Sequence, residues 1–483
     1  MISPEGPPLS RATALVDVIE ALPRDLRARG HEVGIVLPYY REIRENSAHG
    51  HKDTGVTVDV PLGTKTYVAE FLTDRTAGGV QLFYVRCDEF FDRAGIYGEH
   101  GVAYEDNAAR FIFFSKAALE LARRLTPSPQ ILHVHDWAAA LVPVLVRDGQ
   151  MPFRTVLTIH HLAEQGSFWG LDFALTNLPE RYFTPRGIEY FGRMNLLKGG
   201  VLYADKITTV SERYRREILA PDGGCGLDPV LRENAHRLVG ILNGADYERW
   251  DPGTDGFLPH TYDSTNLKNK RLCRDLLLDA IGLAAAPSGP VFGMVTRLVP
   301  EKGFDVLMPV LDRLLSDDVR LIILGEGDPA YERALAIAAK RFPTKFVYRQ
   351  SYDETLAHLI EAGADITLIP SRIEPSGLSA MFSLKYGALP VARATGGIQE
   401  IIEDYDPTTD PPQAGYGFLC YEPSADAFWD AIKRAREIFQ SDQRTWERLI
   451  ERAMQQDFSW ETAAQQYEML YASIVPQSEI RAA

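Results

Sequence analysis

Apolar residues in this chain follow two periods, and the alternation between them is the strongest structural signal in the sequence. Short apolar runs typical of buried strands occur at Gly34–Leu37, Gln81–Val85, Ile131–Val134, Thr155–Ile159, Lys206–Val210, Val291–Val295, Arg320–Leu324, Lys345–Val347, Asp365–Ile369 and Leu389–Val391. Between these runs, apolar residues return every three or four positions, as on one face of a helix. Strands that alternate with helices predict an α/β protein with doubly wound parallel sheets.

The first helix of the chain lacks the usual elements before it. Leu15, Leu22 and Leu26 share one face of a helix that Gly30 ends, and a strand follows over residues 33–37. In a parallel sheet, a strand and a glycine-rich turn that can approach a phosphate normally precede such a unit. Here the sequence offers only residues 1–2 as a strand and Arg-Ala-Thr-Ala, residues 11–14, as the turn.

The spacing of the strands predicts two domains. The first set of apolar runs ends near Val210 and the second begins at Val291, and residues 240–252 between them carry the turn signals Asn-Gly and Asp-Pro. We therefore predict domains over residues 1–242 and 243–458. Residues 459–483 open with a further helix that places Trp460, Tyr467 and Leu470 on one face.

Composition excludes several classes of partner. The 483 residues are 45% hydrophobic and 24% charged, as in ordinary soluble globular proteins, and the net charge of −15 argues against a nucleic-acid partner. Four separated cysteines without a CxxC pair suggest neither a disulfide framework nor a zinc site. The longest apolar run is nine residues, too short to span a membrane, and no signal-peptide pattern is visible. We expect a cytoplasmic protein.

Three motifs with possible chemistry follow strands in the second half. Arg297 and Lys302 come directly after a strand, and two fixed cations there suit a diphosphate, although a pair of solvated charges is the alternative. Glu374 precedes the start of a helix, where a carboxylate can accept hydrogen bonds from sugar hydroxyls or merely complement the helix dipole. A glycine turn at residues 395–397 follows the next strand, but two glycines alone are a weak signal.

Polar groups also end two strands of the first half. Asp136 and His160 stand where these strands stop, which makes them candidates for a ligand site. His133 and His135 alternate with apolar residues, so we expect one of them to be a structural residue inside the sheet layers. A metal site is the weaker interpretation, because no third cluster of ligands stands at suitable spacing, and we predict none.

In this order, these motifs resemble the starch and glycogen synthase family, the retaining glycosyltransferases that extend α-1,4-glucans from a nucleotide-glucose. The resemblance covers nearly the whole chain. The matching segments are Asp17–Pro23, Arg29–His31, His135–Trp137, Thr158–His160, Asn195–Gly199, Tyr203–Asp205, Thr208–Ser211, Gly224–Asp228, Gly240–Gly244, Arg297, Glu301–Gly303, Leu324–Gly325, Tyr352–Glu354, Ala362–Asp365, Pro370–Arg372, Glu374–Leu378 and Arg393–Gly397.

The resemblance implies two Rossmann-like domains facing a cleft, the GT-B arrangement, with the donor mainly on the second domain and the acceptor mainly on the first. The final helix is expected to cross back to the first domain. The donor implied is ADP-glucose, with UDP-glucose as the alternative, and the acceptor is the non-reducing end of an α-glucan. No cofactor and no metal are implied.

The resemblance also assigns roles by position. Arg297 and Lys302 would hold the diphosphate, and Glu374 and His160 the glucosyl unit. Asp136 and Asn243 would line the sugar and acceptor side. Tyr352 would lie against the adenine. The further substrate-binding positions implied are Arg11, Asp17, Tyr97, Trp137, His161, Ser376, Gly377, Leu378, Thr395, Gly396 and Gly397.

Several residues depart from the family pattern. Residues 11–14 replace Lys-Thr/Val-Gly-Gly, so that two glycines carry side chains, and Arg11 preserves charge without lysine geometry. His161 replaces Asn, Ser351 replaces Gly, Ser376 replaces Cys and Ala245 replaces Ile or Val.

The leading hypothesis is a glucan synthase-like glucosyltransferase. The departures leave two alternatives open: a catalytically weak, regulatory homologue that binds a glucan or nucleotide-sugar, and a related transferase that builds another glucoside.

Overall fold

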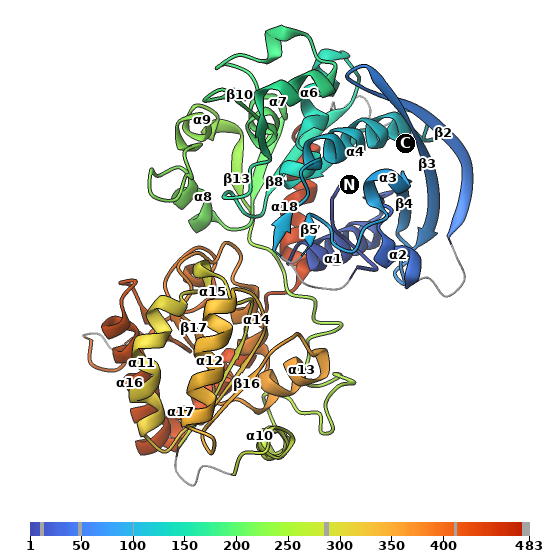
Figure 1. The fold of residues 1–483 in the computed structure, drawn as a ribbon. Coiled ribbons are helices and arrows are strands. Elements are labelled where there is room, and N and C mark those ends of the chain that lie inside the picture. The colour runs from blue at the N-terminus through green and yellow to red at the C-terminus, as the bar shows by residue number, and fades with distance from the viewer. Residues whose placement is uncertain (10–13, 47–50, 100, 285–288, 410–412, 476–483) are drawn as a thin grey trace. The chain divides into compact units, whose positions relative to one another are not determined.

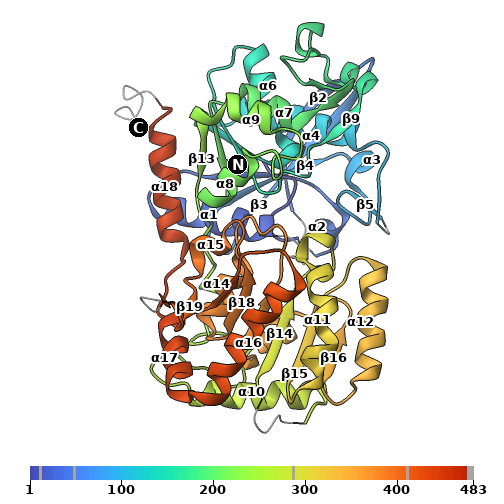
Figure 2. The same ribbon diagram turned by 90° about the vertical axis from the view of Figure 1, so that its left-hand side faces the viewer.

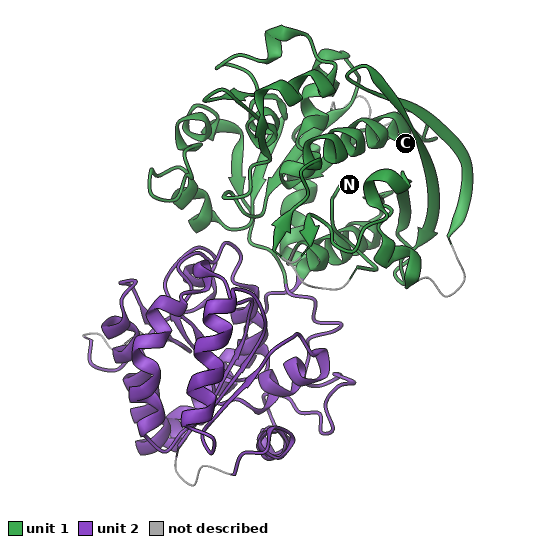
Figure 3. Cartoon of the chain, in the orientation of Figure 1, with its two compact units in different colours: residues 1–244, 460–483 green, residues 245–459 purple. Residues whose placement is uncertain are grey.

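A computed structural model of the chain describes residues 1–9, 14–46, 51–99, 101–284, 289–409 and 413–475. The chain divides into two compact units (Figure 3): unit 1 contains residues 1–244 and 460–483, and unit 2 contains residues 245–459. The predicted boundaries after residues 242 and 458 lie two residues and one residue before these crossings.

Unit 1 is built on a mainly parallel sheet with strand order β13-β12-β8-β7 in one half and β1-β4-β3-β2 in the other. The strands are β1 (Gly34–Pro38), β2 (Lys52–Leu62), β3 (Lys65–Arg75), β4 (Gln81–Arg86), β7 (Ile131–His135), β8 (Arg154–Ile159), β12 (Lys206–Thr209) and β13 (Leu238–Gly240). The helices are α1 (Ala14–Ala28), α2 (Arg41–Glu45), α3 (Asp88–Phe91), α4 (Asn107–Ala122), α5 (Asp136–Ala139), α6 (Leu141–Asp148), α7 (Leu196–Tyr203), α8 (Glu212–Ile218), α9 (Asp228–Glu233) and α18 (Trp460–Ala472).

Ile2 joins the two halves of this sheet. It forms parallel bridges to Val36 on β1 and to Val134 on β7. The Ile2 N–H donates to the carbonyl of His133 at 2.8 Å, and the Ile2 carbonyl accepts from the N–H of His135 at 3.1 Å. Although residues 1–2 are too short to show strand periodicity, they occupy the place that the sequence assigns to a first strand. Of the turn predicted over residues 11–14, Arg11 and the next two residues lie outside the described residues, and Ala14 is the first residue of α1.

The antiparallel edge of this sheet was not predicted from the sequence. β2 and β3 form a long hairpin that pairs antiparallel with β4 and curves along one side of unit 1 (Figure 1). Buried and exposed residues alternate along both strands. A sheet with one solvated face has this alternation, whereas our strand prediction relied on continuous apolar runs.

Smaller elements complete the unit: β5 (Gly98–Glu99), β6 (Val102–Ala103), β9 (Ser167–Trp169), β10 (Glu189–Tyr190), β11 (Arg193–Asn195), and the 3-10 turns η1 (Gly170–Thr176), η2 (Glu180–Tyr182) and η3 (Ala235–Arg237).

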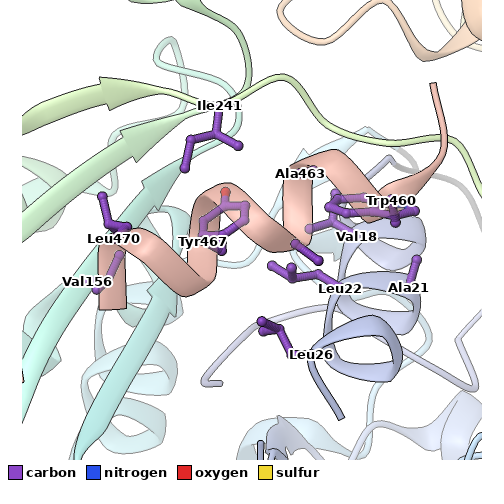
Figure 4. Close-up of a cluster of buried hydrophobic side chains, with 11 residues drawn as sticks. Val18, Ala21, Leu22, Leu26, Val156, Ile241, Trp460, Ala463, Tyr467 and Leu470 are labelled. Atoms are coloured by element: carbon purple, nitrogen blue, oxygen red, sulfur yellow. The ribbon is translucent and has the colours of Figure 1, made fainter. Parts of the chain in front are cut away.

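Helix α18 belongs to unit 1 although it follows unit 2 in the sequence. Its buried face packs against α1 and against residues of β8 and the segment after β13 (Figure 4). Trp460, Tyr467 and Leu470, the residues that the sequence placed on one face, all lie in this apolar cluster together with Leu22 of α1 and Ile241. Burial of this shared face fixes the last helix on the first unit.

Unit 2 is a doubly wound parallel sheet with strand order β16-β15-β14-β17-β18-β21. Helices α11, α12 and α16 cover one face (Figures 1 and 2), and α10, α13 and α14 pack on the other. The strands are β14 (Val291–Val295), β15 (Arg320–Leu324), β16 (Phe346–Arg349), β17 (Ile366–Ile369), β18 (Leu389–Arg393) and β21 (Phe418–Cys420), with a small pair β19 (Tyr405–Asp406) and β20 (Gln413–Ala414). The helices are α10 (Lys268–Ile281), α11 (Phe304–Ser316), α12 (Pro329–Arg341), α13 (Glu354–Gly363), α14 (Leu378–Lys385), α15 (Ile398–Ile401), α16 (Ala425–Ser441) and α17 (Gln443–Met454).

The strand order reverses once within each unit. In unit 2 the chain proceeds outward from β14 in one direction through β15 and β16, and then returns to β17 and proceeds the other way. In unit 1 the same reversal occurs around Ile2, with β1 on one side and β7 on the other. At such a point, consecutive helices leave to opposite faces, which exposes the carboxyl ends of the two strands as a ligand-binding crevice.

The contact between α1 and α18 gives a stability prediction. Leu22 is fully buried in the shared cluster, so Leu22→Ala should lower the free energy of unfolding by about 2–5 kcal/mol. The matched control is Leu171→Ala, because Leu171 is 66% exposed in the same unit and its truncation should cost less than about 0.5 kcal/mol. Urea unfolding of both variants measures the difference, and equal losses would contradict this packing.

Candidate functional site

In unit 2, Lys302 and Glu374 meet at the point of strand reversal. Lys302 ends the short 3-10 turn η4 (Pro300–Lys302) after β14, and Glu374 lies in the loop after β17. The Lys302 ammonium donates to Oε2 of Glu374 at 2.6 Å, and the Ser371 hydroxyl donates to the same oxygen at 3.0 Å. Glu374 is buried and Lys302 is one-fifth exposed, so this ion pair is only partly screened by solvent.

Backbone hydrogen bonds tie the loops after β14, β17 and β18 together. The N–H groups of Arg372 and Ile373 donate to the carbonyl of Glu301 at 2.7 and 3.2 Å. From the end of β18, the Arg393 guanidinium donates to the carbonyl of Ser371 at 2.8 Å. Hydrogen bonds among the segments that follow β14, β17 and β18 therefore hold the loop that carries Glu374.

The glycine turn at residues 395–397 has a packing role in this arrangement. A Cβ on Gly396, whose φ is +45°, would overlap the carbonyl oxygen of Glu374, and one on Gly397 would overlap that of Ser376. The Gly397 N–H donates to the Glu374 carbonyl at 3.0 Å, and Thr395 is buried beside the turn. These glycines allow the loop after β18 to lie directly against the loop that carries Glu374.

Arg297 differs from Lys302 in its surroundings. It follows β14, is exposed, and its guanidinium has neither a hydrogen-bond partner nor an ion-pair partner within the part of unit 2 that the structure describes. Glu374 offsets the charge of Lys302, whereas no carboxylate among the described residues of unit 2 pairs with Arg297. An anion at this strand end would therefore meet an uncompensated planar cation.

The remaining candidates of unit 2 flank these charges. Ser376 and Gly377 are buried, and Gly377, with φ of +73°, directly precedes α14, which begins at Leu378. The first N–H groups of a helix lack partners inside the helix and can bind an anion or hydroxyl oxygens. Tyr352 lies apart, between β16 and α13, with 47% of its surface exposed. It follows Ser351, whose φ of +77° explains why a glycine is the less strained residue there.

A small cavity of about 20 Å³ borders the Lys302–Glu374 pair and includes Glu361 of α13 in its lining. Glu361 is 4% exposed, and its Oε2 has no partner among the described residues. Burial raises the pKa of Glu361 to about 8, and the nearby Lys270 ammonium opposes this shift only in part. Sequence reasoning missed this residue, since a single glutamate on an amphipathic helix resembles a surface position.

In unit 1, Asp136 and His160 come together at the other strand reversal. Asp136 follows β7 with φ of +55°, and its Oδ1 accepts from the backbone N–H of His160 at 2.7 Å. Nδ1 of His135 lies 3.0 Å from Nε2 of His160, and the ring of His133 lies tilted against that of His135 with centroids 4.2 Å apart. Burial lowers the pKa of all three histidines and raises that of Asp136.

Both histidines of β7 are buried, at 2% and 0% exposure for His133 and His135. We expected only one of them to be structural. They are two residues apart on one strand and therefore share a face of the sheet, so both rings enter the same layer.

The other candidates of unit 1 differ in their burial and contacts. Tyr97 donates its hydroxyl to Oε1 of Glu5 at 2.7 Å, and its ring lies 5.8 Å from that of the buried Trp137. Oδ1 of the buried Asn243 has no hydrogen-bond partner among the described residues. His161 and Asp17 are half-buried, the latter in the first turn of α1.

Two negative findings apply to the described residues. No three His, Cys, Asp or Glu side chains there come together as a set that could hold a metal ion. No helix among those residues has the length and apolar character needed to cross a bilayer.

The turn at Gly396 gives a prediction on both stability and site geometry. Because an added Cβ would overlap the Glu374 carbonyl at a positive φ, Gly396→Ala should cost roughly 2 kcal/mol of unfolding free energy and displace Glu374. The control is Gly256→Ala in the same unit, where an added Cβ would meet no heavy atom within 4 Å. Urea unfolding followed by tryptophan fluorescence compares them, and an unchanged midpoint for Gly396→Ala would refute the close approach.

Glu361 gives a prediction on pH. Its pKa is raised from the ordinary 4.5 to about 8, so between these values the folded protein binds a proton that the unfolded chain releases, and stability falls as pH rises. The stability advantage of Glu361→Gln over the parent should grow by about 2.5 kcal/mol from pH 5.5 to pH 7.5. Urea titrations at both pH values measure it; the same difference at both would show that Glu361 is ionised in the fold.

Comparisons with known proteins agree with this architecture. A family model for the starch synthase catalytic domain matches residues 1–233, and the model for glycosyl transferases group 1 matches residues 282–456. A glycogen synthase of Anaeromyxobacter dehalogenans is 41% identical over 98% of both chains, and one of Opitutus terrae is 39% identical over 96% of this chain and 97% of its own.

Solved structures give the same result. The catalytic domain of starch synthase IV from Arabidopsis thaliana, bound to ADP and acarbose, has a TM-score of 0.90 and 31% identity, covering 98% of both chains. A sucrose-phosphate synthase from Thermosynechococcus elongatus shares the fold alone, with a TM-score of 0.59 and 16% identity over 96% of this chain and 94% of its own. The chain is therefore a glycosyltransferase with two Rossmann-like domains, and it belongs to the glycogen and starch synthase family.

Proposed function

We propose that this protein transfers glucose from ADP-glucose to the non-reducing end of an α-1,4-glucan, with retention of the anomeric configuration. The observation that carries the proposal is the set of charges after β14 and β17: an uncompensated Arg297, and Lys302 paired with the buried Glu374. The relatives named glycogen synthase support the glucan as acceptor, and the starch synthase neighbour with bound ADP supports a nucleoside diphosphate donor.

The cations fit the leaving group of such a reaction. When the bond between glucose C1 and the diphosphate breaks, negative charge collects on the departing phosphate oxygen. Arg297 offers a planar fork of donors and Lys302 a point charge, and fixed cations at that position stabilise the charge as it develops. The Lys302 ammonium has further protons to donate while it holds Glu374, because an ammonium has three donors.

The remaining groups bind the glucosyl unit and the acceptor. The new bond from an acceptor hydroxyl to C1 forms on the face from which the diphosphate leaves, and the hydroxyl proton passes to the leaving phosphate oxygen. Glu374 orients sugar hydroxyls on unit 2, and His160 with Asp136 does so on unit 1. Tyr352 provides an exposed ring for the base, and Asn243 an unpaired buried carbonyl oxygen for a hydroxyl.

The altered residues at positions 11–14 and 161 favour a second candidate, a regulatory homologue that binds the donor or glucan and transfers glucose weakly. The deciding experiment incubates the purified protein with ADP-[14C]glucose or UDP-[14C]glucose and glycogen, and counts label in the polymer. Incorporation from ADP-glucose supports the synthase. Donor binding by calorimetry without incorporation from either donor supports the regulatory homologue and refutes the synthase.

Arg297 provides the sharpest test of the leaving-group account. Removal of one donor aimed at developing charge costs about 100-fold to 1,000-fold in turnover, so Arg297→Ala should lower kcat by that amount. Because its side chain is exposed and unpaired among the described residues, the unfolding free energy should change little. The matched control is Arg333→Ala, an exposed arginine on α12, which should keep the parent kcat. Equal kcat values for the two variants would remove Arg297 from the site.

A further inference from the structure

His135 makes a direct side-chain contact with His160 from inside the sheet of unit 1. Its Nδ1 lies 3.0 Å from Nε2 of His160, and the two rings are stacked with an interplanar angle of 30°. His135 is fully buried, whereas His160 is half-buried at the carboxyl end of β8. One ring is therefore held in the interior and the other faces the strand reversal.

Both rings are neutral, which leaves one proton on each. Burial holds the pKa of His135 well below its ordinary value and lowers that of His160 to about 3. His133, whose ring centroid lies 4.2 Å from that of His135, also has a lowered pKa and adds no charge at neutral pH. In the contact between two neutral imidazoles, one nitrogen must donate its N–H and the other must accept.

The second nitrogen of His135 decides which ring donates. Its Nε2 is buried and has no hydrogen-bond partner among the described residues. A buried N–H without a partner is rarer in folded proteins than an acceptor left without one. If His160 donated to Nδ1 of His135, the proton of His135 would have to sit on that buried, unpartnered Nε2.

We propose that His135 is a positioning residue that donates its Nδ1–H to Nε2 of His160 and thereby fixes the proton of His160 on Nδ1. The hydrogen bond at one imidazole nitrogen determines the tautomer of the ring. Nδ1 of His160 has no hydrogen bond within the described part of unit 1. It is also absent from the set of fully buried polar atoms that lack a partner. His160 then presents an N–H donor, not an acceptor, at the end of β8.

A consequence for substrate recognition rests on the proposed function. A fixed donor selects an oxygen that can accept, such as the oxygen of a sugar hydroxyl, and disfavours a donor-only group such as an ammonium at the same place. His160 would also be unable to act as a general base through Nδ1. That agrees with a reaction in which the leaving phosphate takes the acceptor proton.

Nitrogen NMR on the wild-type chain tests the tautomer without any activity. The protein is labelled with 15N-histidine, and long-range 1H–15N spectra at pH 7 distinguish protonated from unprotonated ring nitrogens. The His160 signals are assigned by their loss in His160→Gln. We expect protonated Nδ1 and unprotonated Nε2 for both His135 and His160. A protonated Nε2 on His160 overturns the proposal, whether or not the protein transfers glucose.

Two substitutions of His135 separate positioning from packing. The Asn side chain places an amide N–H close to the position of Nδ1, so His135→Asn should keep the His160 tautomer and much of the parent kcat/KM. His135→Leu fills the space without a donor, and should give mixed His160 tautomers and a kcat/KM about 10-fold or more below that of His135→Asn. Circular dichroism shows whether each variant folds. Unchanged His160 nitrogen shifts in a folded His135→Leu protein would overturn the proposal.

Discussion

Both units depend on one topological constraint, the reversal of strand order in the middle of a parallel sheet. Helices that leave to opposite faces cannot cover the carboxyl ends of the two strands between them. In unit 2 these ends are those of β14 and β17, and the segments that follow them contain Lys302 and Glu374. In unit 1 they belong to the residues around Ile2 and to β7, which ends at His135, directly before Asp136. In both units, the strand order alone leaves these strand ends uncovered by helices.

Within this topology, each unit adds short-range contacts. These contacts hold polar side chains at the strand ends in fixed orientations. Glu374 is held by Lys302, Ser371 and the glycine turn after β18, so its carboxylate has a fixed orientation in the folded protein. His160 is held in the same sense by Asp136 at its backbone and by His135 at its ring. Groups that need no rearrangement when charge develops are the ones that contribute most to catalysis.

Continuous apolar runs predicted most of the fold, because fully buried parallel strands have no solvated face. β14 and β15 lie over the residues that the runs marked, and the glycosyltransferase family was recognisable from motifs at strand ends. The hairpin of β2 and β3 was missed because it alternates buried and exposed residues. Ile2 was discounted because a strand of one or two residues has no period to detect.

The candidate site was predictable only where a residue stands at a strand end. Lys302, Glu374 and His160 all do so. For His133 and His135 the sequence predicted only that one of the two is structural, because both lie inside the strand. Glu361 carried no signal, since its burial arises from tertiary packing. Whether a buried side chain contacts a site residue depends on the distances between neighbouring strands and helices. Sequence periodicity does not encode those distances.

The central claim, glucosyl transfer with retention to an α-glucan, is tested most directly by the first bond that the protein makes. The protein would be incubated with ADP-glucose and a short malto-oligosaccharide, and the anomeric proton of the added residue would be followed by NMR as it appears. The account predicts a new α-linked glucose at the non-reducing end. A β-linked product, or free glucose released without elongation while donor is consumed, would contradict it.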